Sequence, residues 1–220
     1  MSTNKTDSQL KQDVTRELSW DTRIDETTIG VSAHLGVITL TGIVSSWAEK
    51  HAAEQAAQRV AGVLDVANDI EIKPSWNTTK SDADIAVAVR NALQWNVFVP
   101  DKSIKTSVSD HAVTLTGTVR TLTERDQAER VVHEVEGVRG VDNQLFVETP
   151  RVAETTLHAE IKGALERHVA READRITVRI DGDTVILDGT VESWAERRAV
   201  LGAAKGTLGV RRVDDRLRIA

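Results

Sequence analysis

Apolar residues recur with helical spacing at three places along the chain. In each place they fall at positions i, i+4 and i+8, so they form one stripe along a helix that must face a core. The three sets are Leu10, Val14 and Leu18; Ile85, Val89 and Leu93; and Leu157, Ile161 and Leu165. The pattern predicts an amphipathic helix at the start of three successive segments.

Period-two alternation follows each predicted helix and indicates two short strands. The second strand closes each time on Gly-x-Val, in segments 38–44, 113–119 and 185–191. A second helix then begins at a hydroxyl residue with Glu three positions later, which is typical of a capping box. These pairs are Ser46 and Glu49, Thr121 and Glu124, and Ser193 and Glu196. We expect positive φ at Gly62, Gly137 and Gly209, where the second helix stops before a last strand.

The three segments align without a gap, so the chain is a triplicated small domain. A period above 70 residues is too long for a solenoid unit of about 20–50 residues. We predict an α/β (α+β) fold of three tandem αββαβ domains at 7–74, 82–149 and 154–220. Each domain has a three-stranded mixed sheet with two helices on one face, and the open face is a place to bind. Residues 74–82 are predicted to be a linker in which Trp76 docks on a domain.

Composition narrows the function classes. The chain has no cysteine, so no disulfide or thiol chemistry is available. The segment Met1–Asp7 is polar, and no apolar run approaches the ~20 residues of a membrane span, so we expect no transmembrane segment and a cytoplasmic protein. The net charge of −6 argues against nucleic acid as a partner.

Candidate chemistry is sparse. The six histidines show no metal-ligand spacing, and no phosphate loop or nucleophile motif is present, so we predict no enzyme, no cofactor and no metal. Ser46 and Ser193 are interpreted as helix caps. Asn68, Asn143 and Asp215 share the strand parity of the core residues. Such polar side chains either tie the last strand to the second helix or contact a ligand.

Tryptophans and arginines suggest a lipid or anion contact in the third domain. Trp47 and Trp194 lie in the first turn of the second helix, and Trp20 and Trp95 end the first helix. Tryptophan suits a half-apolar, half-wet site, so these residues pack at domain edges or insert at a lipid interface. The predicted contact residues are Trp194, Arg197, Arg198, Arg211 and Arg212.

Strand alternation also assigns side chains to the open sheet faces. Asp69 and Glu71 make the first face acidic, Phe146 gives the second an apolar centre, and Arg179, Arg216 and Arg218 make the third basic. These are either ordinary solvated faces or complementary partner faces, within one chain or between chains.

The order of elements and several residues resemble the BON domain family. That family includes bacterial osmotically inducible periplasmic proteins and related cytoplasmic proteins with three tandem domains. The resemblance implies attachment to phospholipid membranes and a link to stress, with no catalytic residues. The residues that carry it are Leu40, Gly42, Val44, Glu49, Gly62, Val63, Val66, Asn68 and Ile70; Leu115, Gly117, Val119, Glu124, Gly137, Val138, Val141, Asn143 and Leu145, with the segment 91–100; and Leu187, Gly189, Val191, Glu196, Gly209, Val210 and Val213, with Asp215 in place of Asn.

Two functions therefore compete. The first is peripheral binding to anionic phospholipid surfaces in an envelope or osmotic stress response. The second is a protein-interaction scaffold that docks through open sheet faces and has no lipid role. The basic third domain and the family resemblance favour the first, whereas the acidic chain favours the second; self-association remains open in both.

Overall fold

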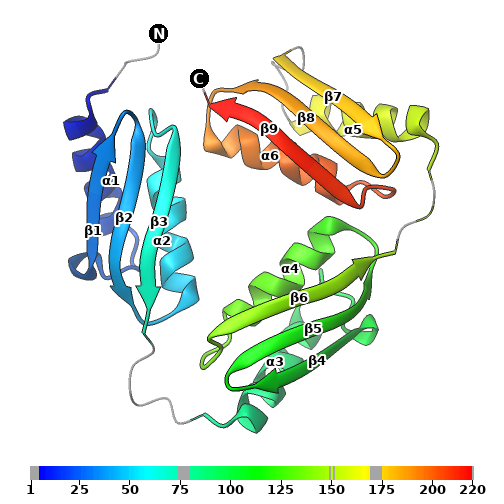
Figure 1. Cartoon of the computed structure of the whole chain (residues 1–220), viewed down its shortest axis with the longest axis horizontal. Coiled ribbons are helices and arrows are strands. Elements are labelled where there is room, and N and C mark those ends of the chain that lie inside the picture. Colours follow the sequence, from blue (N-terminus) through cyan, green and yellow to red (C-terminus); the bar gives the residue numbers. More distant parts are fainter. Residues whose placement is uncertain (1–4, 74–79, 149, 151, 169–174, 220) are drawn as a thin grey trace. The chain divides into compact units, whose positions relative to one another are not determined.

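A computed structural model describes residues 5–73, 80–148, 150, 152–168 and 175–219, with the side chains of 165–168 left out. Each copy of the repeat folds as helix, strand, strand, helix, strand (Figure 1). Copy 1 contains α1 (Asp7–Trp20), β1 (Ile29–His34), β2 (Val37–Val44), α2 (Trp47–Arg59) and β3 (Asp65–Ile72). Copy 2 contains α3 (Asp82–Trp95), β4 (Ile104–Ser109), β5 (Ala112–Val119), α4 (Leu122–His133) and β6 (Gly140–Val147). Copy 3 contains α5 (Glu154–His168), β7 (Ile176–Asp181), β8 (Thr184–Val191), α6 (Trp194–Gly206) and β9 (Arg212–Ile219).

Each sheet has three strands in sequence order, with one antiparallel and one parallel pair. Short 3₁₀ turns, η1 (Glu26–Thr28) and η2 (Asp101–Ser103), lead into β1 and β4. The mixed αββαβ fold predicted from the sequence is confirmed. Trp76 lies outside the described residues.

The glycine of the Gly-x-Val signature is required by a close backbone approach. A Cβ at Gly42 would lie 2.0 Å from the carbonyl oxygen of Thr28, and one at Gly117 would lie 2.0 Å from that of Ser103. Both glycines have positive φ, at 132° and 124°. No side chain fits there, because the residue before the first strand crosses directly over the second strand.

Both helices of each copy cover one sheet face, and the other face is open. The helical stripes Leu10, Val14, Leu18 and Ile85, Val89, Leu93 are buried, as are Leu157 and Ile161. Alternate residues of β2 and β3, including Thr41, Asp69 and Glu71, are exposed on the far side. The predicted open face is therefore present. Leu165 lies where side chains are not described.

The second helices begin at the predicted hydroxyl caps. Ser46, Thr121 and Ser193 each accept a hydrogen bond from the backbone N–H three residues later. The reciprocal half of the predicted capping box is wrong, because the Glu side chain accepts from the residue before the cap: Glu49 from Ser45 N, at 3.1 Å. Full capping boxes occur instead at α1, with Thr6 and Gln9, and at α3, with Ser81 and Asp84. The caps of the first helices thus join only the cap residue and the residue three positions later. At the second helices, the Glu side chain instead binds the residue that follows the preceding strand.

The three predicted glycines do have positive φ, at 93°, 96° and 100° for Gly62, Gly137 and Gly209. They lie in a β-turn beyond the helix rather than at its cap. In copy 1, Val63 N donates to Val60 O at 3.2 Å, which places Gly62 at the third position of the turn. Glycine suits the positive φ of that position, so the turn directs the chain from α2 into β3.

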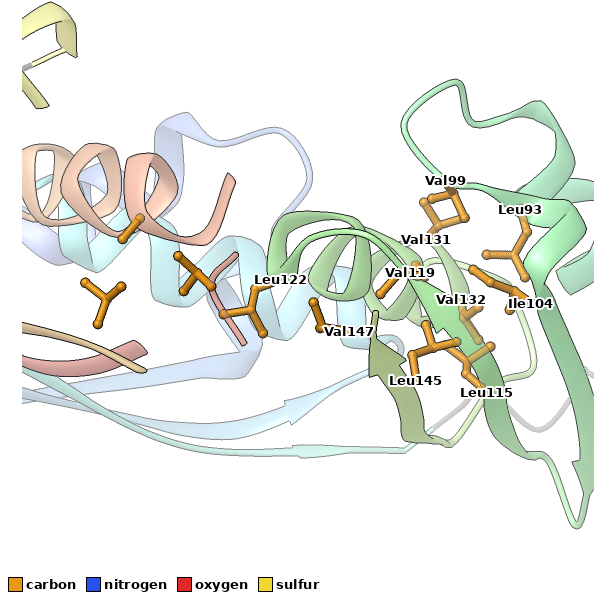
Figure 2. Packing of buried hydrophobic residues seen from close by; sticks show 14 of the residues in the cluster. Leu93, Val99, Ile104, Leu115, Val119, Leu122, Val131, Val132, Leu145 and Val147 are labelled. Atoms are coloured by element: carbon orange, nitrogen blue, oxygen red, sulfur yellow. The ribbon is translucent and has the colours of Figure 1, made fainter. Parts of the chain in front are cut away.

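The described chain divides into two compact units, residues 1–79 and 80–220. Copy 1 has a hydrophobic cluster of its own. Copies 2 and 3 share one continuous cluster, part of which is shown in Figure 2. Within this second unit α4 and α6 pack together, and Lys205 pairs with Asp126 at 2.7 Å. Of the three predicted domains, copies 2 and 3 thus form one packed unit.

Candidate functional site

Among the described residues, the three most exposed large apolar side chains lie where the first helix of a copy ends. Trp20 ends α1 and is 78% exposed, and Trp95 ends α3 and is 84% exposed. In copy 2, Val97 and Phe98 follow at 88% and 69% exposure. Large apolar side chains in contiguous exposed positions are typical of an interaction site. We call Trp95, Val97 and Phe98 the copy-2 tip.

The same turn builds the ends of α1 and α3. The helix-ending tryptophan is followed by Asp21 in copy 1 and Asn96 in copy 2, and each side chain accepts from the backbone N–H two residues later. Asp21 Oδ1 accepts from Arg23 N at 3.3 Å, and Asn96 Oδ1 accepts from Phe98 N at 3.0 Å. Such an Asx turn substitutes for the lost helical hydrogen bonds. It therefore gives the chain after each tryptophan a defined conformation.

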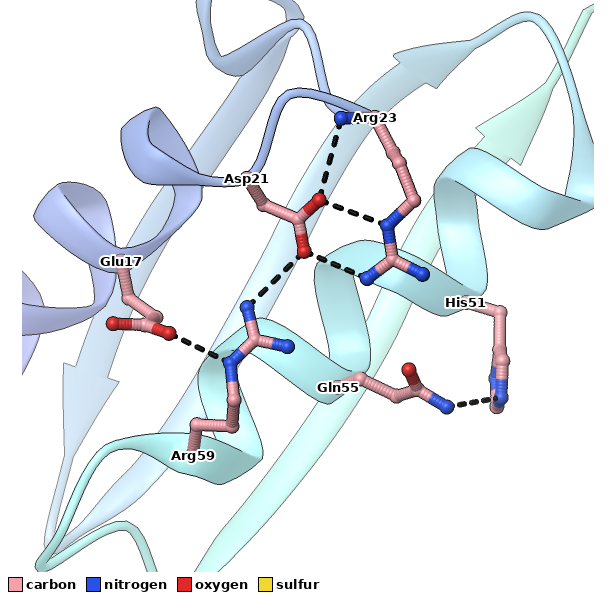
Figure 3. Close-up of polar contacts among 6 residues, drawn as sticks. All are labelled: Glu17, Asp21, Arg23, His51, Gln55 and Arg59. Atoms are coloured by element: carbon pink, nitrogen blue, oxygen red, sulfur yellow. Dashed lines mark hydrogen bonds and ion pairs between the residues drawn. The ribbon is translucent and has the colours of Figure 1, made fainter.

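Copy 1 surrounds this turn with charge, whereas copy 2 uses apolar residues. Arg23 Nη2 lies 2.7 Å from Asp21 Oδ2, and Arg59 bridges Asp21 at 3.1 Å and Glu17 at 2.6 Å (Figure 3). Hydrogen bonds from Arg23, and then from Arg59, hold the pKa of Asp21 well below its usual range, and partial burial opposes them only in part. The network links α1 to α2. Phe98 replaces Arg23 at the equivalent place in copy 2, so copy 1 lacks this apolar tip.

A small cavity lies beside the copy-2 tip, between the last turns of α3 and η2. Its volume is about 170 Å³. The lining residues are Arg90, Leu93, Gln94, Asp101, Ile104 and Thr106. Leu93 and Ile104 are buried core residues, so the floor is apolar and the remaining lining is polar or charged. We call this the copy-2 cavity.

The arginines that we expected to contact lipid have partners within the chain. Arg197 pairs with Asp215 at 2.9 Å and lies 5.0 Å from the ring centre of Trp194. Arg211 pairs with Asp183 at 3.5 Å and lies 5.4 Å from the ring centre of Phe146, which belongs to copy 2. Arg198 and Arg212 are exposed on α6 and at the start of β9. Their predicted lipid role stays a prediction.

The open face of copy 3 is not simply basic. Arg179 pairs with Asp188, and Arg216 pairs with Asp214 at 2.7 Å. The expectation counted the arginines and overlooked two acids on the same face: Asp188 of β8, which is in register with Arg216, and Asp214, two residues before Arg216 on β9. Arg218 is exposed there. Alternating signs, rather than one basic field, characterise this face.

The faces of copies 1 and 2 carry the predicted side chains. Asp69 and Glu71 are exposed on β3, and Lys73 lies 3.2 Å from Glu71. Phe146 is 56% exposed on β6. That these residues, with Arg179, Arg216 and Arg218, meet a partner stays a prediction.

The polar residues of the last strands have a structural role. Asn68 Nδ2 donates to Lys50 O at 3.2 Å, and Asn143 Nδ2 donates to Arg125 O at 3.1 Å. In copy 3, Asp215 accepts from Arg197 Nε at 3.0 Å. All three side chains tie the last strand to the second helix, so the structural alternative is confirmed. Among the described residues, no group of three or more His, Asp or Glu side chains could hold a metal ion.

The geometry that the sequence analysis missed is the copy-2 cavity. One sequence feature could have indicated this cavity. Thr106 is a polar residue on the core face of β4, where copies 1 and 3 have Val31 and Val178. A second feature was Arg90, where copy 1 has Thr15.

The model of the BON domain matches this chain three times, at residues 6–74, 81–149 and 153–220. The chain therefore belongs to the BON domain family, which is not a family of enzymes. It is 29% identical over 143 residues to Osmotically-inducible protein Y of Escherichia coli (strain K12), covering 63% of this chain and 71% of that protein. It is 30% identical over 145 residues to an uncharacterized protein in the gshII 5′ region of Anaplasma centrale, covering 63% of this chain and 94% of that protein.

Among solved structures, the chain is similar to CdsD, a structural protein of the type III secretion system of Chlamydia trachomatis. The sequence identity is 14%, the TM-score is 0.27, and the match covers 96% of this chain and 92% of that chain. The relatives of this chain include an osmotically inducible protein. Over the described residues, none of the helices combines the length and the apolar character that spanning a bilayer requires.

Proposed function

We propose that this protein binds phospholipid surfaces peripherally, with no catalytic step, through the copy-2 tip. The observation that carries the proposal is the exposure of Trp95, Val97 and Phe98 on one turn. Tryptophan favours the boundary between apolar and polar layers, because its ring is apolar and its N–H needs a polar partner. A short exposed apolar turn next to polar side chains matches that boundary.

The expected strength is modest. Burying one large apolar side chain contributes about 1.5–3 kcal/mol. Three such side chains compete with a cost of about 4–15 kcal/mol for lost translational and rotational freedom. Insertion of the tip alone therefore gives weak, reversible binding. Anionic lipid would add about 1 kcal/mol for each basic residue near the surface, and salt would screen that part.

Vesicle co-sedimentation of the intact chain tests the proposal. The variant Trp95→Ser with Phe98→Ser should lower the partition coefficient at least about tenfold, and the loss should persist at high salt. Leu35→Ser is the matched control, because Leu35 is 75% exposed at the β1–β2 turn of copy 1. Unchanged binding of the tip variant, or an equal loss in the control, would contradict the proposal. Comparison of neutral with anionic vesicles measures the electrostatic part of the binding, for which Arg197, Arg198, Arg211 and Arg212 are the predicted residues.

The scaffold function is the second candidate. Phe146 at 56% exposure and Ile43 at 46% give the open faces of copies 2 and 1 apolar positions suited to a protein partner. Phe146→Ser should then reduce self-association or partner binding without affecting vesicle binding. Small-angle scattering at low salt, with Arg216→Glu and Arg218→Glu, tests whether the charged faces set orientation. The cytoplasmic location expected from the sequence stays a prediction.

A further inference from the structure

We propose that the copy-2 cavity binds a phosphate ester that carries a primary ammonium group, the chemistry of a phosphoethanolamine headgroup. The lipid source of that group rests on the proposed function, whereas the site itself does not. The cavity of about 170 Å³ suits a headgroup rather than a whole lipid, since sites for drug-sized ligands usually enclose about 300–1,000 Å³.

The cavity carries two charges of opposite sign, and neither has a partner among the described residues. Arg90 and Asp101 both line it. Among the ion pairs and side-chain hydrogen bonds found between described residues, none involves the Arg90 guanidinium or the Asp101 carboxylate. Elsewhere in the same copy, close charges do pair, as Arg120 does with Glu124 at 2.9 Å. A ligand with one anionic and one cationic group would satisfy both side chains at once.

The uncharged lining supports the same ligand. The Thr106 hydroxyl and the Gln94 amide can each donate and accept hydrogen bonds. The Arg90 guanidinium matches two phosphate oxygens in a planar fork. The Asp101 carboxylate can accept a hydrogen bond from an N–H group of a primary ammonium. A trimethylammonium has no N–H group to donate. The cavity should therefore prefer ethanolamine to choline.

Neither of the other copies has both Arg90 and Thr106 at the equivalent positions in the sequence. Copy 1 has Thr15 and Val31 at the positions of Arg90 and Thr106, and copy 3 has Lys162 and Val178. Copy 1 retains an acid, Glu26, at the position of Asp101, but lacks the opposite charge. The lining residues flank the copy-2 tip in the chain, with Gln94 before Trp95 and Asp101 three residues beyond Phe98. Insertion of the tip would bring the cavity to headgroup level.

Amide chemical shifts of the intact ¹⁵N-labelled chain test the site without a membrane. O-phosphoethanolamine should move the amide signals of Gln94, Asp101 and Thr106, and should bind about tenfold more tightly than phosphocholine or inorganic phosphate. Asp101→Asn should abolish that preference. Thr106→Val should weaken binding in a fold that tolerates valine at this position in both other copies. Glu26→Gln is the matched control and should change nothing.

The results separate the inference from the proposed function. Equal binding of phosphate, phosphocholine and phosphoethanolamine, or no shifts at the lining residues, would overturn the inference. In vesicles, the wild type should prefer phosphatidylethanolamine to phosphatidylcholine about tenfold, and Asp101→Asn should remove only this preference. The variant Trp95→Ser with Phe98→Ser should keep its affinity for the soluble ester but should no longer bind vesicles. If this variant still binds vesicles as well, the proposed function is wrong. The headgroup site is then still supported by the titration with the soluble ester.

Discussion

The buried apolar residues of copy 1 form a cluster of their own, whereas those of copies 2 and 3 form one continuous cluster. A domain of about 70 residues has a thin core and is only marginally stable alone. Copy 1 adds a charge network that joins α1 to α2 through Arg59. Copies 2 and 3 add the packing of α4 on α6. One repeated fold therefore reaches stability by two routes, and we expect the second unit to unfold as a single transition.

The largest expected effect comes from the signature glycines. Gly42→Ala places a Cβ 2.0 Å from a backbone oxygen in copy 1, and Gly117→Ala does the same in copy 2. Each should cost about 3 kcal/mol or more. Hydrogen exchange should show Gly42→Ala opening copy 1 alone, and Gly117→Ala opening copies 2 and 3 together.

Gly202→Ala is the control for this pair, because a Cβ there meets nothing within 4 Å on α6. It should stabilise copy 3 slightly, by about 0.5–1 kcal/mol. If Gly117→Ala leaves the exchange of copy 3 unchanged, the two copies are not one cooperative unit.

Leu122 probes how tightly the shared cluster is built. It is 7% exposed in the first turn of α4, where copies 1 and 3 have tryptophan. Figure 2 shows it beside Val147 in the cluster of the second unit. Leu122→Ala should cost about 2–3 kcal/mol through the cavity it leaves. Urea denaturation followed by circular dichroism measures the loss, and it should lower one transition that contains both copies.

Asn143 and its counterpart Asn68 compare the two units at one position. Asn143 Nδ2 also donates to Glu129 at 2.9 Å, so its removal leaves backbone and side-chain acceptors unsatisfied. Asn143→Ala and Asn68→Ala should each cost about 1–3 kcal/mol. The first should destabilise the transition of the second unit and the second that of copy 1. A loss from Asn68→Ala that appears in the other transition would contradict the division.

The smallest effect is expected at the Lys205–Asp126 pair. These side chains are 35% and 48% exposed, so the pair contributes at most about 1 kcal/mol. Lys205→Ala should lower stability slightly at low salt and not at all at high salt. The coupling energy from a double-mutant cycle with Asp126→Ala checks the pair itself. A large, salt-independent loss would mean that Lys205 acts through its packed stem instead.

Local patterns predicted most of the fold. The i, i+4, i+8 stripes marked α1, α3 and α5, because a helix buries one stripe of its surface. Strand alternation placed Asp69, Glu71 and Phe146 on the open faces, because side chains alternate across a sheet. For copy 3 the same reasoning considered only the arginines of the open face. It left out Asp188 on β8, which pairs with Arg179, and Asp214 on β9, which pairs with Arg216.

The sequence by itself determined the triple repeat, the mixed sheet and the hydroxyl caps of the second helices, since these depend on residues close together in the chain or on strict periodicity. Only the tertiary structure decided that Arg211 of copy 3 stacks on Phe146 of copy 2 and that α4 and α6 join two domains into one body. It also brought Arg90, Asp101 and Thr106 around one cavity from a helix, a turn and a strand. Such contacts depend on how elements pack in three dimensions, and no spacing along the chain specifies that packing.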